Sequence, residues 1–409
     1  MSPRLKRGDQ EHLRRIQALA QAFRPAAPID RSTLFSGRTT QLADLFGVAE
    51  QPGQHAIVYG ERGVGKTSLV MVAAEMLAAG DVLTARTTCD RSDDFGSVWF
   101  KLLDQIRIDV TRRGVGFSAP ETQRSHSAAG LLGDATPYAV RRSIEAVAGE
   151  RRVVLLIDEF DRLASEEARL LFADTIKTLS DQLTQATVVL VGVADTVGEL
   201  IAEHQSIERA VVQIHMPRMS RAELQRIVTQ GMETAGLAVE PAAVDTIALL
   251  AQGLPHYAHL LGQISGRIGL DDLRTTVRAG DVDAAVAEAI EKTQQTVLEA
   301  YSQATAETRA TLYPKVVLAC AMARGDEFGF FGAGDVRETL GELAGKSYDT
   351  RAFNRHLDEL AGPERGNLLQ KRAGVGTARY RFGNPLLQPY VLMRGVAEGA
   401  VAPELLRES

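Results

Sequence analysis

The stretch HAIVYGERGVGKTSLVMVAAEMLAAG, residues 55–80, decides the fold of this chain. Its first residues are largely apolar and predict a strand, its middle is a glycine-rich loop, and its last part predicts a helix that closes at Gly80. The loop matches the pattern G-x-x-x-x-G-K-[ST] from Gly60 to Thr67, between the strand and the helix that this pattern requires. The stretch therefore predicts the first strand and helix of an α/β domain.

The residue types in this loop suit a chain of phosphates. Glycines let backbone N–H groups approach phosphate oxygens, and the N-terminus of the following helix adds a partial positive charge. Lys66 supplies a positive charge for the β- and γ-phosphates, and Thr67 a hydroxyl for Mg²⁺. We therefore expect ATP or ADP with Mg²⁺ at this loop, bound by Gly60, Glu61, Arg62, Gly63, Val64, Gly65, Lys66, Thr67 and Ser68.

A second motif, RRVVLLIDEFD at residues 151–161, carries acidic residues after an apolar run that predicts a buried strand. Asp158 lies where this strand ends and is expected to organise Mg²⁺, directly or through water. Glu159 is expected to polarise the attacking water. The alternative, acidic residues that only cap the next helix, is less favoured because a phosphate loop precedes them.

Strands and helices alternate up to about Met216, which predicts a parallel, doubly wound sheet. Helix is expected over residues 97–110 and 137–148, and an exposed loop over 112–135. After Met216 helices predominate. The expected parts are a basic N-terminal arm (1–30), a nucleotide-binding domain (31–215), a helical lid (216–300) and a C-terminal module (301–400).

Composition limits the remaining classes. Two cysteines, Cys89 and Cys320, cannot form a disulfide framework, and no apolar run has the length of a signal or a membrane span. A soluble, cytoplasmic protein that does not contact membranes is expected. The net charge is −6, yet residues 1–24 and 368–385 each carry +4, which leaves −14 for the rest. This asymmetry favours an anionic partner, with solvated surface charge as the alternative.

The C-terminal module resembles a winged helix, with three helices followed by a hairpin at residues 368–385. In DNA-binding members of that fold the third helix enters the major groove and the wing contacts the backbone. No acidic residue within the hairpin opposes its cations, which suits phosphates of double-stranded DNA. Protein contacts, or protection of a sheet edge, are the alternatives. The candidate DNA contacts are Lys371, Arg372, Arg379 and Arg381 on the hairpin, with Arg351 and Arg355 on the third helix.

Further segments resemble the AAA+ class of P-loop ATPases. LFSGRTTQL, residues 34–42, is similar to the box that precedes the phosphate loop, which implies that Phe35 and Arg38 lie near adenine. VGVADT, residues 191–196, resembles a sensor strand with Asp195 where the class usually has Asn, so that Thr196 is an alternative sensor. SIERAVVQ resembles the segment that bears the arginine finger, which implies that Arg209 acts on a neighbour's ATP; a surface arginine is the alternative. GLPHYAHLL resembles the lid motif and implies that Pro255 and His256 contact nucleotide, with a hydrogen-bonded lid histidine as the alternative for His256.

The order of these parts resembles the origin-recognition (ORC–CDC-type) family, with relations to archaeal-type and STAND-like ATPases. The resemblance implies a slowly hydrolysing ATPase that acts as a nucleotide-controlled DNA-binding switch. Two alternatives are open: a STAND-like signalling or defence ATPase whose winged helix contacts protein, and a transposition-type ATPase regulator. Self-assembly through Arg209, or a partner protein, is expected in each.

Overall fold

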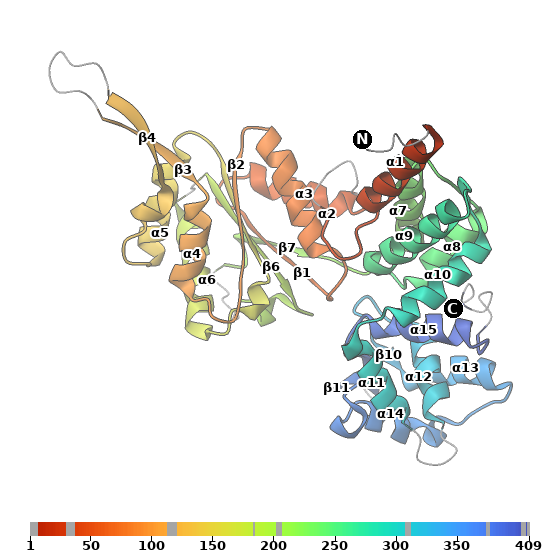
Figure 1. The fold of residues 1–409 in the computed structure, drawn as a ribbon. Helices are drawn as coiled ribbons and strands as arrows, with labels where there is room; N and C mark the ends of the chain where they lie inside the picture. Colours follow the sequence, from red (N-terminus) through yellow and green to blue (C-terminus); the bar gives the residue numbers. More distant parts are fainter. Residues whose placement is uncertain are drawn as a thin grey trace. The chain divides into compact units, whose positions relative to one another are not determined.

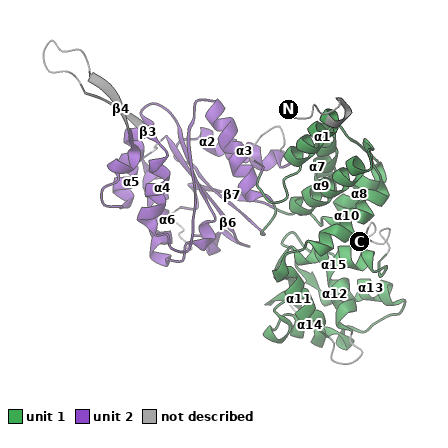
Figure 2. Ribbon diagram, in the orientation of Figure 1, with its two compact units in different colours: residues 1–28, 62–64, 217–409 green, residues 29–61, 65–216 purple. Residues whose placement is uncertain are grey.

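The computed structural model describes residues 7–29, 37–112, 121–182, 185–201, 207–306, 312–373, 377–401 and 406. The chain forms two compact units (Figure 2). None of the described helices is long and apolar enough to cross a membrane. Unit 1 comprises Met1–Pro28, Arg62–Val64 and Pro217–Ser409, and unit 2 comprises Ile29–Glu61 and Gly65–Met216.

Unit 2 is built on a parallel sheet whose described strands have the order β2-β5-β6-β1-β7. The central strands are almost wholly buried, as their apolar runs require when helices cover both faces. Val58 of β1 lies opposite Val191 of β6 and Ile214 of β7. The strands are β1 (His55–Gly60), β2 (Leu83–Thr88), β5 (Val153–Asp158), β6 (Ala186–Val193) and β7 (Val211–His215).

Helices cover both faces of this sheet, α2 and α3 on one face and α4, α5 and α6 on the other (Figure 1). The second face buries an aromatic cluster in which the ring of Phe172 packs against Phe95, Trp99 and Phe160. This cluster and the doubly wound layers fix the sheet that carries the phosphate loop. The helices are α2 (Thr39–Glu50), α3 (Lys66–Ala79), α4 (Phe95–Asp104), α5 (Pro137–Ala148) and α6 (Glu166–Asp181).

Two expectations about unit 2 are wrong. The helix expected over 97–110 ends at Asp104, and β3 (Arg107–Arg112) pairs with β4 (Glu121–Ser127) inside the expected loop. RIDVTR alternates polar and β-branched residues, and this two-residue period favours a strand rather than a continuation of the helix. Beyond this hairpin, Ala128, Ala129 and Leu132 are buried, so the segment is not an exposed loop throughout.

The lid of unit 1 packs around the N-terminal helix α1 (Arg7–Ala22). Phe23, which is fully buried, fits against Gly231 of α7 and Gly262 of α9, and Leu19 fits against Gly266. The residues 7–22 of the expected arm therefore form a docked helix. The lid elements are α7 (Arg221–Thr234), β8 (Ala238–Val239), α8 (Pro241–Leu250), α9 (Pro255–Asp271), β9 (Thr276–Val277) and α10 (Ala279–Glu291).

We expect Gly262→Ala to destabilise the protein, although Gly→Ala inside a helix normally stabilises by roughly 0.5–1 kcal/mol. A Cβ at Gly262 would lie 2.4 Å from a ring carbon of Phe23. The expected loss is about 1–3 kcal/mol of unfolding free energy, measured by denaturant melts. Gly280→Ala in α10, where a Cβ meets nothing within 4 Å, is the control. Equal stability of the two variants would contradict the close packing of the Phe23 ring against Gly262.

The C-terminal part of unit 1 has the predicted order of helices followed by a hairpin. Phe353, Leu357 and Leu360, which recur at helical spacing in the segment expected to form the third helix, are buried. Asp349 caps a short 3₁₀ turn at Thr350–Ala352, and α14 begins afterwards, so the third helix is split. The elements are α11 (Gln295–Thr305), α12 (Tyr313–Met322), β10 (Phe331–Gly332), α13 (Ala333–Ala344), α14 (Asn354–Leu360), β11 (Leu369–Ala373), β12 (Ala378–Phe382) and α15 (Leu387–Ala397), with sheet order β10-β12-β11.

Candidate nucleotide site

The phosphate loop leaves β1 at Gly60 and enters α3 at Lys66. Gly60 has φ 147°, and a Cβ there would lie 2.4 Å from the carbonyl oxygen of Met216. A side chain at this position is therefore excluded by backbone. Gly65, at φ 97°, is the N-cap of α3. This conformation turns the chain sharply into the N-terminus of α3, and the backbone N–H groups at a helix N-terminus favour anions.

Lys66 is held against the loop that precedes it. Its side chain is buried, and Nζ donates to the carbonyl oxygens of Gly60 at 2.9 Å and Glu61 at 2.8 Å. An ammonium group supported by carbonyl oxygens on one side keeps its charge beside the loop N–H groups. This donor set fits a polyphosphate.

The Thr67 hydroxyl donates to the buried carboxylate of Asp158, so α3 and β5 bring the predicted Mg²⁺ pair together. Burial raises the pKa of Asp158, while hydrogen bonds from Thr67 and from the Glu159 N–H oppose the rise. A hydroxyl and a carboxylate are hard oxygen ligands of the kind that Mg²⁺ takes together with phosphates and water. These residues therefore fit Mg²⁺.

Glu159 occupies a left-handed backbone conformation, with φ 51° and ψ 37°. A non-glycine residue there carries roughly 1–3 kcal/mol of strain. The sharp turn takes the chain out of β5 and into a 3₁₀ turn anchored by the buried Phe160. The Glu159 carboxylate is about half exposed and accepts a hydrogen bond from Arg162 at 2.7 Å. The sequence did not single out Arg162.

The two sensor candidates share one partner that the sequence analysis missed. The Asp195 backbone N–H donates to Glu199 Oε2 at 3.1 Å, and the Thr196 hydroxyl lies 3.4 Å from Glu199 Oε1. Both follow β6, which lies between β1 and β5 in the sheet. They are therefore at the same carboxyl edge as the phosphate loop. The roles of Asp195 and Thr196 stay predictions.

Arg209 lies at the amino ends of the strands, not at their carboxyl ends. It is exposed in the turn before β7, and Val211 pairs with His55 at the start of β1. Because the strands are parallel, Arg209 stands at the end of the sheet opposite the phosphate loop of its own chain. A role on a neighbour's nucleotide is compatible with this position and stays a prediction.

The remaining predicted nucleotide contacts are spread over the chain. Phe35 lies outside the described residues. Arg38 of unit 2 is buried at the start of α2, with φ 58°. Pro255 and His256 begin α9 in unit 1, where His256 Nδ1 lies 2.8 Å from the carbonyl oxygen of Pro25. Burial lowers the pKa of His256. Their contact with nucleotide stays a prediction.

Four of the six cations proposed for DNA have carboxylate partners that the sequence analysis did not predict. Lys371 pairs with Asp358 at 2.6 Å, and Arg379 pairs with Asp326 at 3.3 Å. Acidic residues from outside the hairpin therefore oppose two of its four cations, which were expected to be unopposed. Arg351 pairs with Asp349 at 3.0 Å, Arg355 with Glu359 at 2.6 Å, and the guanidinium groups of Arg372 and Arg381 lie over the ring of Phe330.

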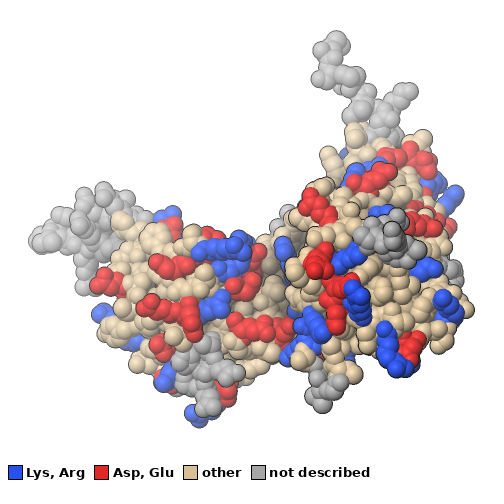
Figure 3. Space-filling view, turned by 90° about the horizontal axis from the view of Figure 1, so that it is seen from below, with Lys and Arg blue, Asp and Glu red and all other residues tan. Residues whose placement is uncertain are grey.

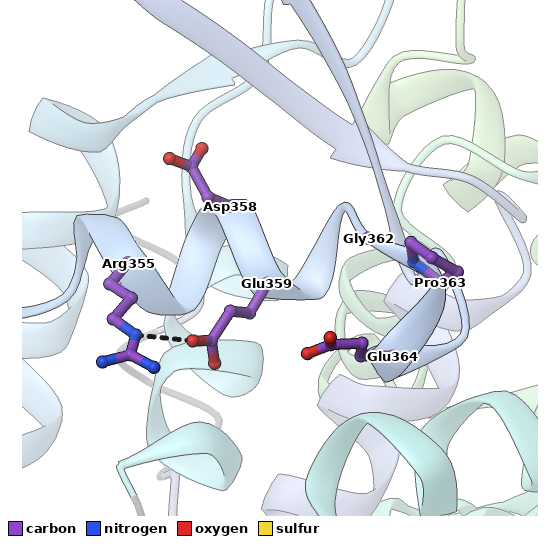
Figure 4. Close-up of a pocket in the computed structure, with 6 residues that line it drawn as sticks. All are labelled: Arg355, Asp358, Glu359, Gly362, Pro363 and Glu364. Atoms are coloured by element: carbon purple, nitrogen blue, oxygen red, sulfur yellow. Dashed lines mark hydrogen bonds and ion pairs between the residues drawn. The ribbon is translucent and has the colours of Figure 1, made fainter.

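A shallow pocket on α14 and the turn after it has an acidic lining (Figure 4). Arg355 bonds to Glu359 there, and Glu364 lies on the same side of the helix as this pair, whereas the Asp358 carboxylate points to the other side. On the face drawn in Figure 3, acidic and basic side chains intermingle. The described surface of the third helix is thus not uniformly basic.

Comparisons with known proteins found solved structures that are similar to this chain. The Walker-type ATPase of Pyrococcus abyssi is similar in structure, with a TM-score of 0.51 and 14% identity over 90% of this chain and 98% of that one. The structure of the ORC1 protein of Aeropyrum pernix in complex with DNA has a TM-score of 0.46 and 18% identity, over 89% of this chain and 94% of that one. The structure of Cdc6p of Pyrobaculum aerophilum has a TM-score of 0.47 and 14% identity, over 95% of this chain and 98% of that one. No curated protein matches the chain.

The strand order and the likeness to the Walker-type ATPase confirm the predicted α/β fold with a parallel, doubly wound sheet. The family model described as novel STAND NTPase 1 matches residues 22–321, which span the sheet, the lid and most of α12. The chain therefore belongs to the novel STAND NTPase 1 family.

Proposed function

We propose that this protein is a nucleotide-operated switch that binds Mg²⁺ and ATP at residues 60–68, hydrolyses ATP slowly, and passes its nucleotide state to the lid and C-terminal helices. The observation that carries the proposal is the hydrogen bond between Thr67 and Asp158 beside the phosphate loop. This bond joins Thr67, whose hydroxyl is expected to bind Mg²⁺, to Asp158, which is expected to organise Mg²⁺.

Mechanistically, Mg²⁺ neutralises charge on the phosphates when it is bound. Lys66 and the N–H groups at the start of α3 bind and orient the γ-phosphate. Glu159 orients a water molecule and accepts its proton as the water oxygen bonds to the γ-phosphorus and the bridging bond to ADP breaks. Asp195 cannot donate a hydrogen bond from an ionised side chain, and Glu199 lies beside Thr196. Weak sensing of the γ-phosphate supports slow turnover.

The lid and the C-terminal helices are joined closely enough to respond as one body. Arg218 donates to the carbonyl oxygen of Gln252 and to the side chain of Gln388. Gln388, which is buried in α15, donates to the carbonyl oxygen of Ala321 at 2.9 Å. The Tyr257 hydroxyl of α9 donates to Leu386 at 2.7 Å. A conformational change in the lid would therefore be transmitted to α12 and α15 through direct hydrogen bonds.

Amide hydrogen exchange tests this proposal. With Mg²⁺ and ATP, compared with ADP and with neither, we expect protection at residues 60–68 and parallel changes in α9 and α15. Lys66→Ala should remove all of these changes. If nucleotide alters residues 60–68 and α9 but leaves α15 unchanged, the lid and C-terminal helices do not act as one body.

Assembly is part of the proposal. Arg209 is placed at the sheet edge opposite its own phosphate loop, which supports a role as an arginine finger toward a second copy or a partner protein. In such an assembly the hydrolysis rate per chain rises with protein concentration.

Binding of double-stranded DNA by the winged-helix-like C-terminal part is the second candidate. It is favoured by the register of the hairpin, in which Arg372 lies opposite Arg379 and Gln370 opposite Arg381, so that cations gather on adjacent strands. Paired cations can exchange a carboxylate for a phosphate, although the exchange weakens the net gain.

Fluorescence anisotropy with duplex DNA over a salt series tests the second candidate. Alanine at Lys371, Arg372, Arg379 and Arg381 together should remove a binding that weakens steeply with salt. Alanine at Arg267 and Lys292, paired cations of the lid, is the matched control. Absence of binding by the wild type, with ATP and with ADP, would leave the switch without a DNA partner.

A further inference from the structure

We propose that Arg162 is a positioning residue that restrains Glu159 and thereby sets the slow rate of hydrolysis. This inference rests on the proposed role of Glu159 as the base. The geometry that carries it is the ion pair of 2.7 Å between Arg162 Nη1 and Glu159 Oε2, made within one turn at the end of β5.

The backbone of this turn is fixed, so the side chains are the parts that can change. The Arg162 N–H donates to the Glu159 carbonyl oxygen at 2.9 Å. Phe160 between them is fully buried, with its ring edge-on to Phe172 at 5.1 Å. Asp161 accepts a hydrogen bond from the Val193 N–H at 2.8 Å, which ties the turn to the end of β6. In contrast, the side chains of Arg162 and Glu159 are 48% and 46% exposed.

The ion pair opposes the position required of Glu159. A charge-assisted hydrogen bond from Arg162 occupies Oε2, one of the two carboxylate oxygens, and sets the orientation of the carboxylate. A carboxylate held toward Arg162 has one oxygen fewer for a water molecule. Release of the guanidinium therefore frees that oxygen and lets the carboxylate turn.

Further acidic groups act on the Arg162 guanidinium. The pKa of Arg162 is raised, first by its hydrogen bond to Glu159 and further by the charges of Asp90 and Asp161. Asp90 follows β2 and is itself bonded to Ser92 and Lys101. The positive charge of Arg162 is thus favoured by more than one carboxylate.

Steady-state ATP hydrolysis tests the inference. Arg162→Ala should raise kcat about two- to five-fold, the size expected for loss of a half-exposed ion pair, with KM unchanged. An arginine with only a structural role would not raise kcat when it is removed. Arg162→Lys, which keeps the charge, should restore the wild-type rate.

Arg141→Ala is the control, because Arg141 pairs with Glu145 on α5 in the same unit. It should not change kcat. A rate for Arg162→Ala at or below that of the wild type, or an Arg162→Lys variant as fast as Arg162→Ala, would overturn the inference. Glu159→Gln separates the two failures: if it is inactive while Arg162→Ala behaves as wild type, only the restraint is wrong. If Glu159→Gln hydrolyses ATP normally, the base itself is misassigned.

Discussion

Lys66→Ala should reduce the affinity for ATP and ADP by about 100-fold or more. Hydrogen bonds to a charged group contribute roughly 1.5–3 kcal/mol each, and every 1.4 kcal/mol is a factor of ten in Kd. Lys66 is the residue of the loop whose ammonium is buried against the carbonyl oxygens of Gly60 and Glu61. No other side chain of residues 60–68 except Arg62 carries positive charge. Titration calorimetry with Mg²⁺ and ATP measures the loss.

The thermal stability of the same variant separates lost binding from lost folding. At a nucleotide concentration of 100 Kd, binding stabilises a protein by about 2.7 kcal/mol, so ADP should raise the Tm of the wild type. Lys66→Ala should keep its own Tm within a few degrees and lose the response to ADP. Lys177→Ala, an exposed lysine of α6 in the same unit, should retain the response. Wild-type affinity in Lys66→Ala would mean that residues 60–68 do not hold the phosphates.

Local patterns predicted local structure well. The helix expected over 137–148 has those bounds in the structure, because Thr136 caps it and Pro137 suits its first turn. The apolar run before Asp158 is a buried strand, as expected for a parallel sheet. Strand β7 was not predicted, because Val211–His215 is short and its period is weak. It is a strand because it pairs with β1, which is a tertiary effect.

Contacts between distant segments lay beyond the sequence analysis. Lys371 and Arg379 stand in a stretch without acidic residues, yet Asp358 and Asp326 reach them from α14 and from the turn before β10. Charge counted along the chain cannot reveal such pairing, because the pairing is set by how the hairpin folds back on the helices. The same holds for Phe23, whose seat is made by glycines of α7 and α9.

Ion pairs within one turn are different, because spacing alone brings them into reach. Glu159 and Arg162 are three residues apart, a separation at which side chains meet on a helical turn. The pair could have been predicted had the turn after β5 been recognised as 3₁₀. What spacing could not supply was the left-handed conformation of Glu159, which decides where its carboxylate lies. The role of the pair therefore became visible only with the structure.

Glu159→Gln should retain the affinity for ATP and lose hydrolysis by a factor of about 10² to 10⁴, the range that a positioned general base contributes. The amide has the shape of the carboxylate but cannot accept the proton of the attacking water. It also cannot form an ion pair with Arg162, so this variant has neither the base nor the restraint. Single-turnover hydrolysis, with binding measured on the same sample, gives both quantities.

The control for this substitution is Glu150→Gln, an exposed glutamate in the turn before β5, which should hydrolyse ATP as the wild type does. A pattern of full binding and lost turnover in Glu159→Gln alone would locate the base at the end of β5, beside Asp158, the acid proposed to organise Mg²⁺. Such a variant would hold ATP without turnover. It would then report, by hydrogen exchange in α9 and α15, the state that ATP imposes on the lid and C-terminal helices. Normal turnover in Glu159→Gln would instead place the base elsewhere and remove the reason for Arg162 to slow the reaction.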